Sequence, residues 1–181
     1  MTDAAEQFVS RTDYLTFERD VPIRHEWVGG LLYAMTGTSG RHNRLALRLV
    51  HSMTPSADLH GCRVYASDMK VVAGNFGYYP DVMVVCDPEL PGEYHEERPC
   101  LIAEVRSPST GDRDRREKWA AYKTLESLRH YVMIRQDDTQ IEHWFRNGEG
   151  PWQHEIIGPD DDLRLTCPPI TIPVADLYRN L

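Results

Sequence analysis

Two acidic residues stand in stretches of sequence that are otherwise apolar. Asp81 opens the run DVMVVC directly after Pro80, and Glu104 lies within CLIAEVR. Because side chains alternate along a strand, Glu104 and Arg106 should point to the same side of the sheet. A carboxylate avoids burial in such a strand unless it is paired or binds a metal. These positions are therefore the first candidates for chemistry.

Each acid has a structural explanation when it is taken alone. Asp81 could accept turn hydrogen bonds at the start of a strand, and Glu104 could pair with Arg106 or with another base. Taken together, two carboxylates on neighbouring strands can converge on one hard cation. Mg²⁺ binds oxygen ligands, often one or two carboxylates together with water and a substrate phosphate. Such an ion would polarise a phosphoryl group and lower the pKa of a bound water.

The motifs around these acids resemble the Uma-type family of putative endonucleases, within the restriction-endonuclease-like PD-(D/E)-x-K nuclease superfamily. The matching stretches, in family order, are HEWVGG, RHNR, YYPDVMVV, EVRSPST, DRREKWAAY and HYVMI. They cover nearly the whole chain, from the first expected hairpin to the closing PPI segment. The resemblance implies a metal-dependent nuclease that uses Mg²⁺ or Mn²⁺ to hydrolyse DNA phosphodiester bonds by direct attack of water.

The resemblance also implies roles for individual residues of this chain. Asp81 and Glu104 would be metal ligands and catalytic residues, and Glu26 of HEWVGG would complete the acidic site. Without the resemblance, Glu26 would be interpreted as a solvated hairpin charge. His42 of RHNR falls where such proteins carry histidine, and we expect it to contact the substrate, although a lone helix histidine is more often at the surface, or behind the catalytic groups, than catalytic.

The sequence departs from the superfamily pattern at its lysine. That pattern has lysine two residues after the acid, whereas this chain has Arg106. Arginine keeps its proton at ordinary pH and cannot act as a base, but it can stabilise phosphate charge. The resemblance places the positive group on the next helix, at Lys118, which would orient or help deprotonate the attacking water. The alternative is a surface lysine paired with Asp114; Arg113, in DRDRR, belongs to a solvated face or contacts phosphate.

The apolar patterning predicts a mixed α/β (α+β) fold with a central mixed sheet flanked by helices and an N-terminal β-hairpin. Helices are expected over 12–18, 41–53 and 112–128, the first capped by Thr12 or Asp13, with one last turn near the C-terminus. Strands are expected at HEWV, LLYAM, CRVYAS, DMKVVA, PDVMVVC, CLIAEVR, HYVMIR, QIEHWFR and WQHEII. Ser107, Ser109 and Thr110 are interpreted as caps and turn formers, since no G-x-S-x-G turn surrounds them.

Length and composition set the broad class. The 181 residues are expected to form one domain, and no long apolar run or signal peptide is visible, so a cytoplasmic protein is expected. The net charge of −8 argues against a tight, general nucleic-acid binder. The four cysteines, which are widely scattered, are predicted to be buried free thiols and not disulfides or a zinc site: Cys62, Cys86, Cys100 and Cys167.

Two other functional hypotheses stay open at this stage. The chain could be a non-catalytic nucleic-acid or protein interaction module that retains the nuclease fold, a view favoured by Arg106 and by the acidic balance. It could also hydrolyse another phosphoester, because a fold does not name its substrate. A homodimer is expected, since small metal nucleases that cut both strands often need two copies of the site. Trp144, Phe145 and Trp152 could belong to the core or to such an interface.

Overall fold

The computed structural model of the chain describes residues 8–89, 92–106 and 112–181, the side chains of 112–114 excepted. Its helices are α1 (Arg11–Phe17), α2 (Gly40–Leu59), α3 (Asp112–Tyr122) and α4 (Val174–Tyr178). Its strands are β1 (His25–Val28), β2 (Leu31–Ala34), β3 (Arg63–Ala66), β4 (Lys70–Ala73), β5 (Phe76–Tyr78), β6 (Val82–Val85), β7 (His95–Glu96), β8 (Leu101–Arg106), β9 (His130–Arg135), β10 (Ile141–Phe145), β11 (Gln153–Ile157), β12 (Asp162–Thr166) and β13 (Pro169–Pro173). The predicted caps Ser107, Ser109 and Thr110, and the side chains of Arg113 and Asp114, lie outside the described residues.

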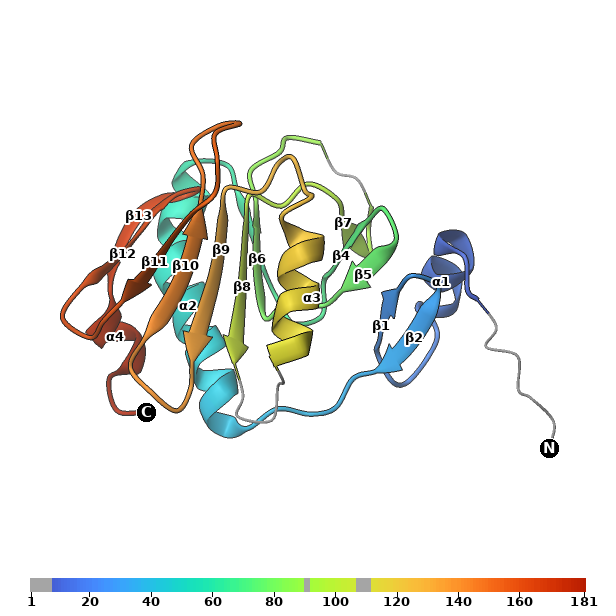
Figure 1. The fold of residues 1–181 in the computed structure, drawn as a ribbon, viewed down its shortest axis with the longest axis horizontal. Coiled ribbons are helices and arrows are strands. Elements are labelled where there is room, and N and C mark those ends of the chain that lie inside the picture. Colours follow the sequence, from blue (N-terminus) through green and yellow to red (C-terminus); the bar gives the residue numbers. More distant parts are fainter. Residues whose placement is uncertain (1–7, 90–91, 107–111) are drawn as a thin grey trace.

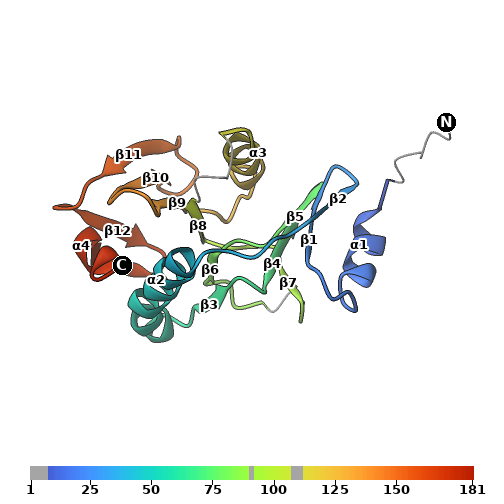
Figure 2. The same ribbon diagram turned by 90° about the horizontal axis from the view of Figure 1, so that it is seen from below.

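The larger sheet has the order β11-β10-β9-β8-β6-β3 (Figure 1). β8 and β9 are parallel, and α3 lies in the connection between them, while the other described pairs of this sheet are antiparallel. Helix α3 lies on one face of this sheet and α2 on the other, as the view from below shows (Figure 2). The predicted mixed sheet flanked by helices is therefore confirmed.

Strand alternation divides the interior into two apolar layers. Val82 and Val84 of β6 belong to the layer that includes the buried face of α2, whereas Met83 and Val85 belong to the layer beneath α3. On β8, Ala103 packs on the α2 side. Asp81 and Glu104 therefore have the parity that turns a side chain toward α3 and away from α2.

A second sheet, with the order β2-β1-β5-β4-β7, carries the N-terminal hairpin. Gly29 and Gly30, both with positive φ, form its turn, in keeping with the predicted tight hairpin. Helix α1 supports the hairpin from outside: the Tyr14 hydroxyl donates to the carbonyl oxygen of His25 at 2.9 Å, and the buried Glu18 accepts from the backbone N–H of His25 at 2.7 Å. These contacts fix the strand that carries Glu26.

Several expected elements differ in their limits. The N-cap of α1 is Ser10, and not Thr12 or Asp13, because its Oγ accepts from the backbone N–H of Asp13 at 3.1 Å. Helix α2 continues past Met53 to Leu59, and α3 ends at Tyr122 and not near 128. Strands β5, β7, β12 and β13 were not expected from the sequence. Trp144 and Trp152 pack against the layer beneath α3, as core side chains would.

The prediction that the cysteines are free thiols is wrong. Disulfides join Cys62 to Cys86 and Cys100 to Cys167. The disulfides could not be predicted from the sequence, because the cysteines are far apart along the chain and only the strand order brings them together.

Candidate active site

Asp81 and Glu104 face one cavity from neighbouring strands. The cavity has a volume of about 480 Å³ and lies between the two sheets, beside the N-terminus of α2 and beneath α3. Asp81 immediately precedes β6, and its Oδ2 accepts from the backbone N–H of Val105 on β8 at 2.7 Å. That hydrogen bond ties the strand start to the strand that carries Glu104. The two carboxylates are thereby held on the same wall.

Lys118 reaches the acidic residues from α3. Its Nζ lies 2.7 Å from Glu26 Oε1 and 3.6 Å from Glu104 Oε1, and it stands over the ring of Tyr78 at 5.4 Å from the centroid. Only about 14% of its side chain is exposed. Glu26 is therefore brought into the same cluster, and is not the solvated hairpin charge that the sequence alone suggested.

Tyr122 supports Glu104 from the end of α3. Its hydroxyl donates to Glu104 Oε1 at 2.8 Å, and its ring packs edge-on against Tyr78. The sequence analysis gave this tyrosine no role, although it stands four residues after Lys118. That spacing places both side chains on the same face of a helix, and could have indicated the contact.

His42 contacts Asp81 from the first turn of α2. Its Nε2 lies 3.2 Å from Asp81 Oδ2. The Ser39 side chain caps this turn by accepting from the backbone N–H of His42 at 3.1 Å, and its hydroxyl donates to Gln136 at 2.9 Å. The helix start is thus anchored to the end of β9, and the imidazole is buried beside the carboxylate. His42 therefore contacts a predicted metal ligand and supports its carboxylate, which is one of the positions that the sequence left open for it.

Arginines supply further positive charge to the cavity. Arg106, at the end of β8, and Arg115, on α3, both line it. Arg115 Nη1 also contacts both carboxylate oxygens of Glu142, at 3.0 and 2.9 Å, which holds the guanidinium at the cavity wall. Arg115 belongs to the cluster for which phosphate contact was considered, but the sequence did not single it out.

The electrostatics of the site favour a bound cation. Burial raises the pKa of the Glu104 carboxyl to about 7; the positive charge of Lys118 opposes this shift, and the negative charges of Asp81 and Glu26 add to it. Burial lowers the pKa of His42, but its hydrogen bond to Asp81 and the negative charges of Asp81 and Glu104 outweigh that effect, so the net shift is upward. Closely spaced acids that resist ionisation together are stabilised by added positive charge.

The donor set fits a hard divalent ion such as Mg²⁺ or Mn²⁺. Among the described residues, the contacts of the two acids fall on Asp81 Oδ2 and Glu104 Oε1. Both carboxylates line the cavity, where a bound ion could reach them. Two carboxylate oxygens with room for water and phosphate oxygens are what such an ion requires.

Comparisons with known proteins agree with this architecture. A family model described as Uma2, putative restriction endonuclease, matches residues 11–175. Two uncharacterized proteins of Synechocystis are similar along their length: slr1290 is 31% identical over 176 residues, covering 96% of this chain and 93% of its own, and sll1609 is 28% identical over 172 residues, covering 92% and 97%.

A solved structure shares the fold. The crystal structure of a putative nuclease belonging to DUF820 from Anabaena variabilis superposes with a TM-score of 0.75 at 13% identity, covering 91% of this chain and 94% of that one. At that identity the likeness concerns the fold alone. The family model, however, spans almost all of the chain. This chain belongs to the Uma2 family of putative restriction endonucleases.

Proposed function

We propose that this protein is a divalent-metal-dependent nuclease that hydrolyses DNA phosphodiester bonds by direct attack of water. The observation that carries the proposal is the convergence of Asp81, Glu104 and Lys118 on one cavity, with Lys118 Nζ 3.6 Å from Glu104 Oε1. Family membership and the nuclease-like fold support the same class of activity.

In the proposed reaction, each residue of the cavity has a distinct role. Asp81 and Glu104 would hold Mg²⁺ or Mn²⁺, which supplies charge stabilisation at the phosphoryl oxygens and a water of lowered pKa. Lys118 donates a hydrogen bond that orients the attacking water, and Glu26 holds its ammonium group in place. Arg106 and Arg115 bind phosphate oxygens of the DNA backbone. His42 and the backbone N–H of Val105 both contact Asp81 Oδ2 and so help to position this carboxylate.

The first test concerns Asp81. Asp81→Asn keeps the size of the side chain but weakens the metal ligand, so cleavage of supercoiled plasmid in Mg²⁺ or Mn²⁺ should fall by about 100-fold or more. Asp58→Asn is the matched control, because Asp58 is exposed on α2. Circular dichroism and the melting temperature show whether both variants remain folded.

The same assay separates the nuclease from the alternative of a non-catalytic module. A folded wild-type protein that cleaves neither single- nor double-stranded DNA with either metal would contradict the proposal and favour the module. Full activity in Asp81→Asn would reject the assignment of the site. The proposed homodimer, in which two sites would act on the two strands, is tested separately by light scattering of the purified protein.

A further inference from the structure

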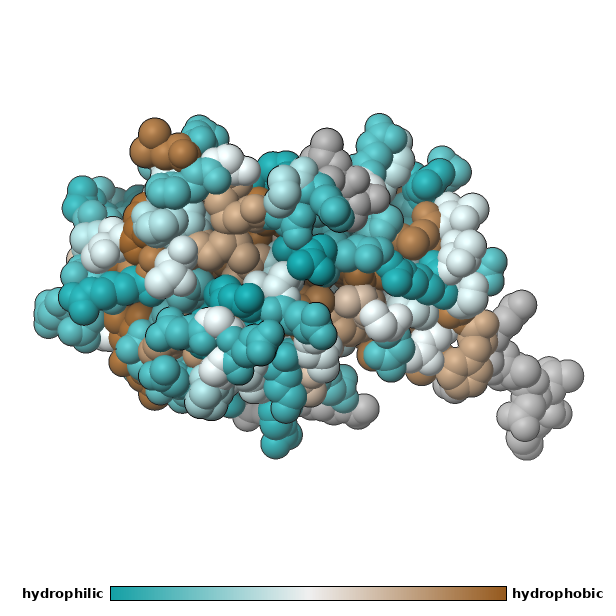
Figure 3. All heavy atoms as spheres, turned by 90° about the horizontal axis from the view of Figure 1, so that it is seen from above, coloured by the Kyte–Doolittle hydropathy of each residue, from teal (hydrophilic) through white to brown (hydrophobic). Residues whose placement is uncertain are grey.

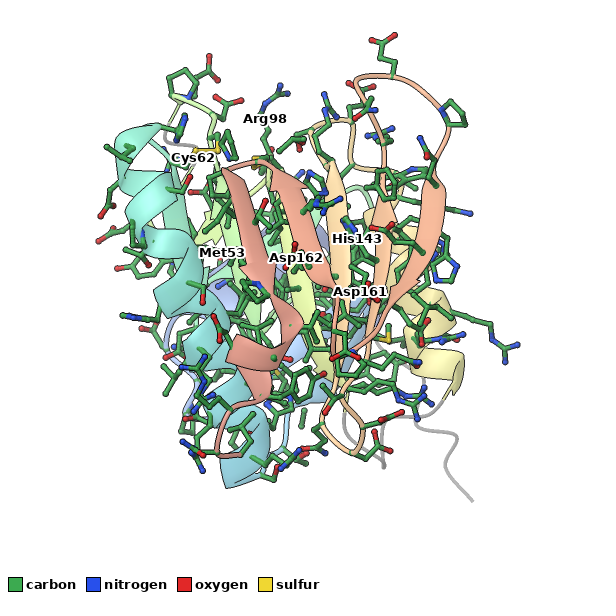
Figure 4. The ribbon with its side chains drawn as sticks, turned by 90° about the vertical axis from the view of Figure 1, so that its left-hand side faces the viewer. Met53, Cys62, Arg98, His143, Asp161 and Asp162 are labelled. Carbon is green, nitrogen blue, oxygen red and sulfur yellow. A yellow bond between two sulfur atoms is a disulfide. The ribbon has the colours of Figure 1, made fainter. Side chains whose placement is uncertain are left out.

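Four cysteines gather at the end of the larger sheet that is opposite to the cavity. Cys62 immediately precedes β3, Cys86 follows β6, Cys100 precedes β8, and Cys167 stands in the turn between β12 and β13. Figure 4 shows Cys62 and a disulfide at this end of the molecule. Asp81 is five residues before Cys86, a span of about 16 Å at about 3.3 Å per strand residue. The cysteine cluster is therefore separate from the candidate active site.

The strand pairing dictates this convergence. Arg63 pairs with Val85, so the residues one step further out, Cys62 and Cys86, stand opposite each other. The backbone N–H of Cys100 donates to the carbonyl oxygen of Val84 at 2.9 Å, which sets the third cysteine beside them. The short turn joining β12 to β13 delivers Cys167 to the same place. The four thiol positions are thus fixed by four different strand ends.

The sulfurs contact one another beyond the two disulfide bonds. Cys86 Sγ is bonded to Cys62 Sγ, and it also lies 3.2 Å from Cys167 Sγ and 3.5 Å from Cys100 Sγ. The Sγ atoms of Cys86, Cys100 and Cys167 all lie within 4.8 Å of one another. Two disulfides that act only as independent cross-links do not need to share a single site.

The spacing of these three sulfurs approaches that in the coordination shell of one tetrahedral ion, whereas Cys62 Sγ, bonded to Cys86, is not in the group and would have to move toward it. Zn²⁺ with four thiolates has Zn–S bonds of about 2.3 Å, which places the sulfurs about 3.8 Å apart. The contacts between the two disulfides are shorter than this by only a few tenths of an ångström. Cleavage of both S–S bonds would let each bonded pair open to the same separation by side-chain rotation.

The surroundings also suit a structural metal. Cys62 and Cys100 are buried at 8% exposure within the apolar layer on the α2 side, while Cys86 and Cys167 pack against it. Thiolates are unstable in such a layer without a cation, and one Zn²⁺ offsets two of the four negative charges. Two arginines lie at the same end, each paired with a carboxylate: Arg63, next to Cys62, with Glu96 at 3.3 Å, and Arg98, labelled in Figure 4, with Asp87 at 2.6 Å.

We propose that Cys62, Cys86, Cys100 and Cys167 form a tetrathiolate zinc site when the chain is reduced. The structure holds the oxidised form with two disulfides. A dithiol reductant supplies two electrons and two protons to each disulfide and is itself oxidised, giving four thiols. One Zn²⁺ then binds the four sulfurs and displaces their protons. Soft thiolates in tetrahedral array select zinc or iron–sulfur centres, and a group this compact accommodates a single ion.

The zinc site would anchor the C-terminal ribbon of β12 and β13 to the central strands. Cys167 is the ligand from this ribbon, whereas the other three cysteines belong to the ends of β3, β6 and β8. Because an unfolded chain does not preform the site, zinc binding adds to the stability of the fold. The inference does not depend on the proposed nuclease activity.

The test is a titration of the reduced full-length chain with Co²⁺, which replaces Zn²⁺ and is visible. After reduction with dithiothreitol and anaerobic desalting, we expect one equivalent to give intense thiolate-to-cobalt charge-transfer absorption and the visible bands of a tetrahedral ion. One equivalent of Zn²⁺ should abolish both and raise the melting temperature. The oxidised chain should show neither signal. Cys100→Ser and Cys167→Ser should lower the affinity for Co²⁺ at least tenfold.

The control is the double variant Asp81→Asn, Glu104→Gln, which removes the candidate carboxylate ligands but should keep the thiolate absorption unchanged. The titration of the wild-type chain shows whether the thiolates bind the metal ion, even if a cysteine variant does not fold. Four thiols that react with Ellman's reagent equally with and without Zn²⁺, and no charge-transfer band, would overturn the site. Protein that retains iron and not zinc at the four cysteines would overturn the choice of metal.

Discussion

At the scale of single residues, the positive charge in the cavity is divided between a strand and a helix. Arg106 ends β8, while Lys118 comes from α3 and contacts Glu26 and Glu104. An arginine cannot exchange a proton at ordinary pH, so any proton transfer from the water must involve another group. Lys118 is proposed to orient that water as a hydrogen-bond donor, since its ammonium group contacts both Glu26 and Glu104.

The prediction at this scale concerns Lys118. Lys118→Met keeps the length of the side chain but removes its charge and its hydrogen-bond donors, so DNA cleavage should fall by about 100-fold or more. Lys123→Met is the matched control, because Lys123 is exposed just beyond the end of the same helix and should retain full activity. Initial rates of plasmid nicking measure both. Equal rates for the two variants would remove Lys118 from the mechanism.

The sequence predicted the part of the site that local pattern controls. Period-two alternation put Glu104 and Arg106 on one side of a strand, and Gly29-Gly30 indicated the hairpin that carries Glu26, whereas the place of Glu26 in the site came from the family resemblance. The ion pair of His42 with Asp81 could not be predicted, because it joins α2 to the start of β6. The cysteine cluster depends in the same way on the order of strands in the sheet.

At the scale of elements, the strands that were not predicted from the sequence form because they pair with neighbouring strands. β5 has three residues including a glycine, and β7 has only two, so neither carries a periodic signal of its own. β12 alternates in burial, but DLRLT is polar at every second position and contains only two large apolar residues. Its pairing with β13, and the packing of both strands on the apolar layer that includes α2, stabilise the strand that its sequence does not indicate.

Buried histidines join β9, β10 and the end of β12, and they predict how stability depends on pH. His130 contacts Thr166 and His143 through its two ring nitrogens, at 2.8 and 3.0 Å, and His143 contacts Glu155 at 2.8 Å. Burial lowers the pKa of His130 to about 3, with His143 and Arg129 adding to the shift. Burial also lowers the pKa of His143, although Glu155 opposes it.

Between these folded values and about 6.5, the unfolded chain binds more protons than the folded chain, so the free energy of unfolding should fall as the pH falls. His130 alone contributes a slope of about 1.4 kcal/mol per pH unit below pH 6. Urea unfolding at pH 7.5, 6.0 and 5.0 measures it. His130→Gln should have a shallower slope than the wild type, while His51→Gln, at an exposed position, should not. Identical slopes in all three proteins would contradict this account.

At the scale of the whole molecule, charge limits how the protein can hold DNA. The chain has a net charge of −8, and the face seen in Figure 3 is largely hydrophilic with hydrophobic side chains in separate patches. No helix among the described residues is long and apolar enough to cross a membrane.

The described cations that line the cavity are Arg106, Arg115 and Lys118. Arg115 contacts Glu142, and Lys118 contacts Glu26.

DNA binding should therefore depend only weakly on salt. If these three cations each neutralise one phosphate, the logarithm of the association constant should fall with the logarithm of salt concentration with a slope of about −3 or shallower. Fluorescence anisotropy of a labelled duplex with the Asp81→Asn variant measures the slope without cleavage. Arg115→Met in that background should make the slope shallower by about 1. A slope of about −6 would require a cationic surface well beyond the cavity, and DNA would then be held mainly outside the site that is proposed to cut it.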